Sequence, residues 1–280
     1  MSGEQTAPKN TTINNFIALN RRMARALERH LPAAFTRHLH TVYKYDVAAA
    51  VNQRLGQTIL DIGGGRECPF LPFVKNPAAY LIVAVDYSDG QLRFNYDLNQ
   101  KVVADAASPA FPFREGSVDL IVSRSVVEHL YDNTAFFANC ARVLRPGGTM
   151  IHTFPCKLAP FSLLNRMLPN RVTKRLIAYF YPEWADECGF VAYYDFCQFR
   201  QIRDILCKNG FIIHKFEFRY YQSIYFDFFF PLYILMLLYD LTTWFFSIKG
   251  LACAILVEGS KPLPEHGAVA RSCSVECLSA

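Results

Sequence analysis

The sequence predicts an α/β protein with a doubly wound, mostly parallel sheet of seven strands. Short β-prone segments alternate with amphipathic helical segments, and a glycine-rich turn follows the first β-prone segment. Strands that alternate with helices usually pair in parallel and carry helices on both faces of the sheet. The 280 residues are enough for one such domain with substantial additions.

The β-prone segments form two groups, separated by a long aromatic stretch. The first group comprises residues 58–62, 80–86, 102–106, 117–124 and 149–154, and the second comprises residues 211–221 and 251–260. Two amphipathic segments, residues 133–144 and 197–211, are predicted helices, and Gly210 closes the second. We therefore predict one α/β domain at residues 55–260.

The segment before this domain, residues 15–54, is predicted to be helical. Its apolar residues recur at three- and four-residue spacing and form a stripe that we expect to pack on the domain: Phe16, Leu19, Met23, Leu27 and Leu31. Four arginines lie off the stripe, at positions 21, 22, 25 and 29. They form either a solvated basic face or a contact with anionic headgroups or an acidic substrate. Residues 1–14 and 261–280 are predicted to be disordered.

An aromatic insertion, residues 157–195, follows the fifth predicted strand. Ligands of open α/β sheets bind at the carboxyl edge, so we expect this insertion to act as a substrate lid. Tyr193 and Tyr194 lie near its end, and we predict that they line an acceptor pocket. The alternative is that they pack inside the lid.

A second insertion, residues 227–247, separates the last two predicted strands. Residues 228–239 carry no charge, but this run is shorter than the roughly 20 residues that span a bilayer. Asp227 and Asp240 also argue against a span. Three interpretations stay open: a buried core helix, a homodimer contact, and an element that lies in a membrane interface.

Composition excludes some classes of protein. The net charge of +5 is mild, and no basic stripe or nucleic-acid motif marks a dedicated nucleic-acid binder. The nine cysteines show no metal-binding spacing, so we expect no metal site and mostly buried thiols. The polar first residues lack a signal peptide, and together with the thiols they favour a cytoplasmic protein.

The first predicted strand ends in the sequence "QTILDIGGGR", residues 57–66. Glycine has no Cβ, so the backbone at Gly63, Gly64 and Gly65 can turn sharply and approach a ligand closely. A strand followed by such a turn commonly holds a nucleotide at a sheet edge. A plain glycine-rich turn is the alternative.

Two further aspartates follow predicted strands. Asp86 ends the second strand, where a carboxylate can accept two hydrogen bonds from a ribose diol. Asp105 ends the third strand beside Ala106, where an adenine edge could lie. Asp86 could instead cap a helix, and Asp105 could instead be a turn residue.

The ordered set of segments resembles class I S-adenosylmethionine-dependent methyltransferases of the small-molecule and lipid type. The segments are "LDIGGG", "VDYS", "ADA", "FPFREGSVDLIVSRSVVEHL" and "RVLRPGGTM". The resemblance runs from about residue 57 to 155 and more loosely to 260. It implies a Rossmann-like methyltransferase fold, S-adenosylmethionine as cofactor, and a small or lipid-linked acceptor.

The resemblance also implies roles for individual residues. Gly63, Gly64 and Gly65 would contact the methionyl part of the cofactor through their backbone, and Asp61 would shape their loop. Asp86 would bind the ribose, with Tyr87 against the adenine. Asp105 and Ala106 would contact the adenine. Ser123 and Arg124 would face the cofactor and its transferring methyl group.

His129 is the candidate general base, and a local packing role is the alternative. One departure from the family is Glu67, which stands where many members carry a third glycine. Two other functions stay open: an NAD(P)-dependent oxidoreductase and a non-catalytic, methyltransferase-like adaptor. Against the oxidoreductase, the chain lacks the third glycine of a dinucleotide fingerprint and has no Tyr-x-x-x-Lys pair.

Overall fold

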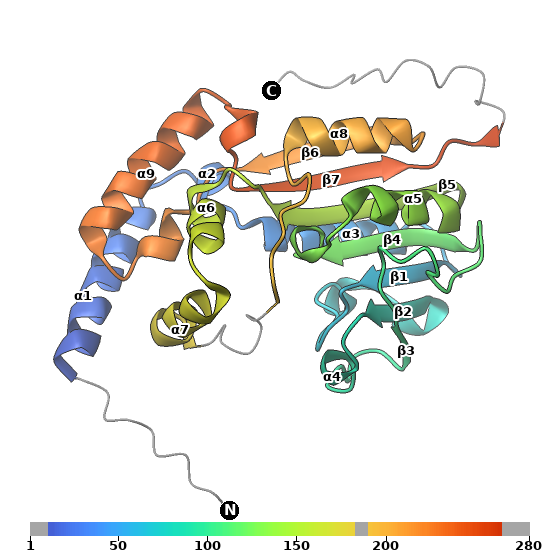
Figure 1. Cartoon of the computed structure of the whole chain (residues 1–280), viewed down its shortest axis with the longest axis horizontal. Coiled ribbons are helices and arrows are strands. Elements are labelled where there is room, and N and C mark those ends of the chain that lie inside the picture. Colours follow the sequence, from blue (N-terminus) through green and yellow to red (C-terminus); the bar gives the residue numbers. More distant parts are fainter. Residues whose placement is uncertain (1–10, 183–189, 265–280) are drawn as a thin grey trace, which may run out of the picture.

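The computed structural model describes residues 11–182 and 190–264, which form a sheet of seven strands flanked by helices (Figure 1). The strands are β1 (Thr58–Ile62), β2 (Leu81–Asp86), β3 (Gln100–Val103), β4 (Val118–Arg124), β5 (Leu144–Pro155), β6 (Ile212–Arg219) and β7 (Ala254–Ser260). Their order in the sheet is β3-β2-β1-β4-β5-β7-β6. Only β7 runs antiparallel to its neighbours, so the predicted mostly parallel, doubly wound sheet is confirmed.

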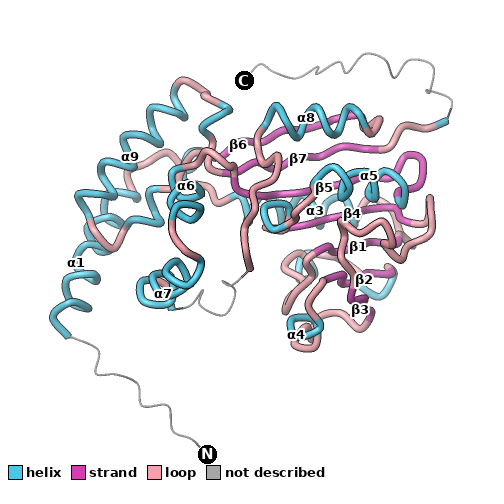
Figure 2. The backbone as a smooth tube through the Cα atoms, viewed as in Figure 1, coloured by secondary structure: helices cyan, strands magenta, loops and turns pink. Residues whose placement is uncertain are grey.

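Helices cover both faces of the sheet, as Figure 2 shows. Helix α3 (Leu39–Asn52) packs on one face, and α5 (Asn133–Val143) and α8 (Phe199–Lys208) pack on the other. Alternate residues of each strand enter different cores: Leu60 packs with α5, whereas its neighbour Ile59 packs with α3. This division into two apolar layers follows from the period of two in a β-strand.

The remaining regular elements are short or lie outside the two layers. The helices are α1 (Thr11–Glu28), α2 (Ala33–Thr36), α4 (Asp89–Leu92), α6 (Pro160–Met167), α7 (Asn170–Phe180) and α9 (Phe230–Phe245). The 3-10 turns are η1 (Leu71–Phe73), η2 (Pro77–Ala79), η3 (Val127–His129), η5 (Ser223–Phe226) and η6 (Lys249–Leu251).

The helical prediction for the amino-terminal segment is confirmed, and Leu27 and Leu31 of the predicted stripe pack against the core, but the first three residues of the stripe do not. Phe16, Leu19 and Met23 are between 43% and 56% exposed. Asn20 and Ala24 are buried instead. The periodicity identified the helix, but several of its faces are apolar enough to pack, and the contact with α9 selects the narrow face at Asn20 and Ala24.

Two predicted disordered ends are partly ordered. Helix α1 begins at Thr11, so residues 11–14 are helical. After β7, the Lys261 amide donates to the carbonyl of Gly148, which extends the β5 edge to residues 261–264. The other residues of both predicted ends lie outside the described ranges.

Helices α1, α6, α7 and α9 gather at the carboxyl edge of the sheet, the edge toward which β1, β2 and β4 point (Figure 1). Arg21 of α1 holds this group together: it donates to Asp227 at 3.2 Å and to the carbonyl of Phe180. Tyr181 donates to the same Asp227 oxygen at 2.9 Å. We call these four helices the helical lobe.

Five cysteines of the described residues are free thiols, namely Cys68, Cys140, Cys156, Cys197 and Cys253. All but Cys253 are buried, as the sequence predicts. Cys207 is disulfide-bonded, so the prediction of a thiol is wrong there. Among the helices that the structure describes, none has the length and apolar run to cross a membrane.

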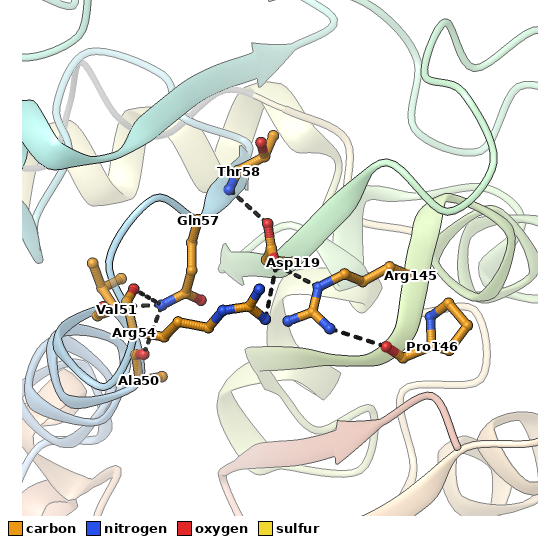
Figure 3. A network of polar contacts seen from close by, with 8 residues as sticks. All are labelled: Ala50, Val51, Arg54, Gln57, Thr58, Asp119, Arg145 and Pro146. Carbon is orange, nitrogen blue, oxygen red and sulfur yellow. Dashed lines mark hydrogen bonds and ion pairs between the residues drawn. The ribbon is translucent and has the colours of Figure 1, made fainter. Parts of the chain in front are cut away.

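A polar network at the amino edge of the sheet ties β1, β4 and β5 to α3 (Figure 3). Asp119 of β4 accepts from the Thr58 amide at 2.8 Å and from Arg145, and lies 3.7 Å from Arg54. Burial acts to raise the pKa of Asp119, but these hydrogen bonds and charges together lower it. Beside it, Gln57 donates to three carbonyls at the end of α3. Asp119 therefore has a structural role, distant from the carboxyl edge.

We predict that Asp119→Ala lowers the free energy of unfolding by about 1–3 kcal/mol, because the Thr58 amide and Arg145 lose their acceptor. The lowered pKa means that wild-type Asp119 stabilises the fold above about pH 4 and that this contribution fades as the pH falls through the folded-state value. Urea unfolding at several pH values measures both effects. Asp204→Asn, at an exposed pair on α8, is the matched control and should stay within about 0.5 kcal/mol. An Asp119→Ala protein as stable as wild type at pH 7 would contradict the structural role.

Candidate functional site

The glycine turn after β1 lies against β2. Gly63 and Gly65 have φ angles of +73° and +34°, which favour glycine. The amides of Gly63 and Gly64 donate to the Val85 carbonyl at 2.7 and 3.3 Å. A Cβ on Gly64 would lie 2.8 Å from the Cβ of Ala84, closer than packed atoms allow. The close approach of the ends of β1 and β2 therefore requires glycine in this turn. The turn leaves backbone without side chains at the carboxyl edge.

A buried asparagine fixes this turn from the β2–β3 connection. Asn95 is fully buried and donates to the Gly64 carbonyl at 2.7 Å. Its side-chain oxygen accepts from the amides of Asp97 and Leu98. Sequence reasoning missed Asn95, because a lone asparagine between two strands carries no motif.

Asp86 ends β2 directly beside the glycine turn. Its carboxylate accepts from the Gly65 amide at 3.3 Å and from the Ser88 amide at 2.9 Å. Burial raises the pKa of Asp86, and the two amides act in the opposite direction. The structure thus brings Asp86 and Gly65 together, as the nucleotide interpretation requires.

The turn after β3 presents a second acidic group at the same edge. Asp105 accepts from the Ala107 amide at 2.9 Å and lies beside the hydroxyl of Tyr131. Asn139 of α5 donates to the carbonyl of Ala106 at 3.0 Å and so attaches this turn to α5. Ala106 is buried. Tyr131 and Asn139 were not predicted, since both lie in segments that read as ordinary helix and loop.

Asp61 occupies an unusual position inside the edge. It is 3% exposed, and its Oδ2 has no hydrogen-bond partner among the described residues. Burial raises its pKa to about 7, and the Arg124 guanidinium acts against this rise. The fully buried Tyr43 of α3 also has an unpaired hydroxyl within the described part of the chain, and burial and then Asp61 raise its pKa. Cys68 also hydrogen-bonds to the Asp61 side chain, but the Oδ2 atom and the Tyr43 hydroxyl remain without partners within the described residues and can receive a polar ligand group.

Glu67 has a partner that explains its departure from the family pattern. It accepts from Arg124, at the end of β4, at 2.9 Å. The pair is partly exposed, so it contributes little stability, but it ties the end of the glycine turn to β4. Where many family members have a third glycine, this chain has Glu67, whose ion pair with Arg124 holds the turn and orients the arginine.

The side chain of Ser123 does not face this edge, contrary to prediction. It is fully buried and shares a hydrogen bond of 2.7 Å with His152 of β5. The His152 ring lies edge-on to Phe136 and Phe137, and burial lowers its pKa to about 3. Strand alternation turns the Ser123 side chain into the α5 layer, so only its backbone can meet a ligand.

The chain leaves β4 through a strained residue. Ser125 has a φ angle of +55°, and its amide donates to the Thr153 carbonyl at 2.8 Å. The next residue, Val126, fills the space where a Cβ of Gly63 would lie. Left-handed backbone at a non-glycine residue often marks a functional site. The sequence gives no signal for it.

His129 and Glu128 lie in η3, directly after this turn. The His129 Nδ1–H donates to the Val191 carbonyl at 3.0 Å, and its Nε2 lies 3.8 Å from Glu128 Oε1. Burial lowers the pKa of His129 and raises that of Glu128 to about 8. Both side chains are therefore largely neutral near pH 7, and Glu128 is a buried acid that sequence reasoning missed.

The end of the predicted lid segment is bonded to η3 through its backbone. The amides of Tyr193 and Tyr194 donate to the Glu128 carbonyl at 2.8 and 2.9 Å. Tyr194 is 2% exposed within the core, so it packs inside the lid as the alternative interpretation stated. Tyr193 is 54% exposed. Phe190 of the lid meets Tyr87 edge-on, with ring centroids 5.5 Å apart.

Comparison with known proteins identifies the domain. Residues 60–152 match the family model of a methyltransferase domain. An uncharacterized methyltransferase of Mycobacterium sp. (strain KMS) is 31% identical over 106 residues, which cover 38% of this chain and 42% of that protein. A probable S-adenosylmethionine-dependent methyltransferase of Mycobacterium tuberculosis (strain ATCC 25618 / H37Rv) is 34% identical over 80 residues, 28% of either chain.

The chain carries a class I S-adenosylmethionine-dependent methyltransferase domain. The resemblance stated from the motifs is confirmed. A solved geranyl diphosphate methyltransferase has the same fold, with a TM-score of 0.51, 15% identity, and coverage of 79% of this chain and 78% of that one. The matched region spans less than half the length of the curated relatives above.

The methyltransferase domain brings most of the predicted residues to one edge. The glycine turn, Asp86 and Asp105 lie at neighbouring strand ends, and Asp61 lies just inside them. No cluster of potential metal ligands occurs among the residues that the structure describes. The orphaned Asp61 oxygen and the bare glycine backbone fit the ammonium group and the chain of a methionyl group.

We predict that Gly64→Ala weakens binding of S-adenosylhomocysteine at least tenfold and lowers the free energy of unfolding by about 1–3 kcal/mol. The new Cβ would lie 2.8 Å from Ala84 and 3.1 Å from the Asp61 carbonyl, so the turn must move. Calorimetric titration and urea unfolding measure the two effects. Gly250→Ala is the control, because nothing lies within 4 Å of its Cβ position. Equal affinity in both variants would show that the turn does not contact the cofactor.

The raised pKa of Asp61 predicts a pH-dependent affinity. Pairing with a ligand ammonium group favours the ionised carboxylate, so affinity for S-adenosylhomocysteine should rise about tenfold from pH 6 to pH 8. Asp61→Asn should remove this rise.

Thermal unfolding accompanies the titration. A folded-state pKa above the unfolded value means that ionisation of Asp61 destabilises the fold as the pH rises from about 4 through 7, and bound ligand should reduce that loss. A rise in affinity that persists in Asp61→Asn would assign the pH dependence to another group.

Proposed function

We propose that this chain transfers the methyl group of S-adenosylmethionine to a small or lipid-like acceptor. The observation that carries the proposal is the contact between Asp86 and the glycine turn: a carboxylate at the end of β2 lies 3.3 Å from the Gly65 amide at the carboxyl edge. An ionised carboxylate only accepts hydrogen bonds, so both hydroxyls of a ribose in this position could donate to Asp86. The family match to residues 60–152 supports the same cofactor.

Different residues at the edge would contact different parts of the cofactor. Gly63, Gly64 and Gly65 would line the methionyl part through backbone, with Asp61 opposite its ammonium group. Asp86 would hold the ribose, and the turn at Asp105 and Ala106 would lie at the adenine. Tyr87 extends from the same edge toward Phe190, so the lid would cover the adenosine on that side.

The bound cofactor supplies an activated methyl group, so the protein must position a nucleophile and exclude water. The backbone bonds from Tyr193 and Tyr194 to Glu128 of η3 support a role of the insertion as a lid near the end of β4. His129 keeps one hydrogen on Nδ1 and has a pKa lowered by burial, so its Nε2 is unprotonated near pH 7 and can accept a proton. Its role as the base remains a prediction.

A lipid-like acceptor is favoured by the surroundings of the lid. Met167 of α6 is 81% exposed, and Tyr179 of α7 and Tyr193 are each 54% exposed. Such side chains at the carboxyl edge suit an apolar acceptor chain better than a hydrophilic metabolite. An oxidoreductase fits less well, since no dinucleotide fingerprint follows β1. A non-catalytic adaptor fits less well, since the acids at positions 86 and 105 remain at the edge.

The test uses the full chain with S-adenosylmethionine that carries a tritiated methyl group. It is incubated with total lipid extract in one arm and water-soluble metabolites in the other, and label is counted after solvent extraction. We predict label in the organic phase. Label only in the water-soluble arm would reject the lipid-like acceptor but keep the methyl transfer.

Asp86→Ala is the matched loss-of-function variant. It should weaken S-adenosylhomocysteine binding about 100-fold, because hydrogen bonds to a charged group are lost. Asp89→Ala, three residues on and exposed in a pair with Arg93, should bind as wild type. A folded wild-type protein that binds no S-adenosylhomocysteine would overturn the proposed function.

A further inference from the structure

Apolar side chains of the helical lobe are exposed on faces that no described element covers. Helix α9 buries Tyr233, Leu237 and Thr243, yet Leu235, Leu238 and Phe245 on its opposite face are 62%, 59% and 77% exposed. These residues recur at three- and seven-residue spacing and share one face of the helix, with the exposed Thr242 between Leu238 and Phe245. A soluble surface rarely carries such a stripe without an occupant.

Helices α1 and α7 add basic stripes beside apolar ones. On α1, Arg22 and Arg25 adjoin the exposed residues Leu19 and Met23, and Arg29 follows directly after the helix. On α7, Arg171, Lys174 and Arg175 are exposed beside Val172 and Leu176. A basic amphipathic helix is typical of elements that lie on anionic membranes.

A groove lies between α1 and the end of α7, and all of its basic lining comes from the arginines at positions 21–29. The groove has a volume of about 980 Å³, and Arg21, Arg22, Arg25 and Arg29 line it together with Tyr179. Arg21 is neutralised by Asp227, but the other three arginines reach the groove from exposed positions. Guanidinium groups bind phosphate oxygens in pairs of hydrogen bonds, so the groove suits a phosphate headgroup.

The acidic residues of the lobe point inward. Asp240, the one acid of α9, accepts from the amides of Gln222 and Ser223 at 2.8 and 2.7 Å. Asp227 is held by Arg21 and Tyr181, and Glu28, the one acid of α1, lies beside Tyr221 and Tyr233. Helices α6 and α7 contain no acid. The exposed face of the four helices is therefore apolar and basic.

We propose that the helical lobe docks on an anionic phospholipid bilayer. The exposed side chains of α9 enter the headgroup region, and the arginines of α1 bind lipid phosphates in the groove. A membrane contact was one of three interpretations of residues 227–247, and this surface extends it to helices far away in the sequence. The helical lobe and the predicted lid lie at the same edge of the sheet. Docking would therefore bring the candidate site next to the bilayer, from which an acceptor could enter directly. The docking itself is independent of the proposed methyl transfer.

The experiment is flotation of the full chain with vesicles of phosphatidylcholine alone or mixed equally with phosphatidylglycerol. The wild type should float with the mixed vesicles and much less with the neutral ones. Arg22→Gln, Arg25→Gln and Arg29→Gln together should lower the partition coefficient by about fivefold for each arginine. Leu235→Ser, Leu238→Ser and Phe245→Ser together should lower it at least tenfold.

Two control variants keep the test specific. Lys75→Gln, Lys101→Gln and Arg114→Gln remove the same charge from exposed positions outside the lobe, and Leu55→Ser with Tyr96→Ser removes exposed apolar groups there. Both should float as wild type. Every variant is first checked by circular dichroism and urea unfolding, so that a misfolded protein is recognised whether or not it binds S-adenosylhomocysteine.

Three outcomes would overturn the proposal. Equal flotation of the lobe variants and the wild type would remove the lobe from the contact. An equal loss in the control variants would reduce the effect to net charge. Light scattering that shows a wild-type dimer, dissociated by the α9 changes, together with no flotation, would assign the surface to a second copy of the chain.

Discussion

The close approach of the glycine turn to β2 is the constraint on which the site depends. Two amides of the turn converge on the Val85 carbonyl, and Gly64 leaves no space for a Cβ beside Ala84. Only this approach brings the Gly65 amide to Asp86, one residue beyond Val85. Asn95 and the Glu67–Arg124 pair then hold the turn from either side. The bare backbone and the carboxylate are thus parts of one arrangement.

The two edges of the sheet differ in how their polar groups are satisfied. At the amino edge, Asp119 has a full set of partners and a lowered pKa. At the carboxyl edge, Asp61 and Glu128 are buried with unpaired oxygens among the described residues, and burial raises their pKa values to about 7 and 8. Unpaired buried acids cost stability, so their presence at one edge marks it as the functional one.

The fold and the outline of the site could be predicted because they rest on local patterns. Strand and helix periods identified the sheet, and the positions of the glycines, Asp86 and Asp105 after successive strands predicted that they lie at one edge, as they do. Residues that act through tertiary contacts gave no such signal. Tyr43, Asn95 and Glu128 reach the site from elements whose sequences read as ordinary packing.

The wrong predictions concern side chains that could have pointed to more than one side of their helix, strand or loop. The apolar stripe predicted the helix and the packing of Leu27 and Leu31, but not its earlier buried side, where Asn20 accepts from the Phe230 amide of α9. Ser123 lies at the expected strand end, but alternation turns its side chain to His152. Tyr194 was predicted to line an acceptor pocket, but it has a left-handed backbone and its ring packs in the core.

Hydrogen–deuterium exchange with and without S-adenosylhomocysteine tests the central claim most directly, because it reports where the ligand binds. Our account predicts slower exchange in peptides that contain the glycine turn, Asp86–Ser88 and the turn at Asp105, with little change at the amino edge around Asp119. Protection confined to the groove between α1 and α7, or none at saturating ligand, would contradict it.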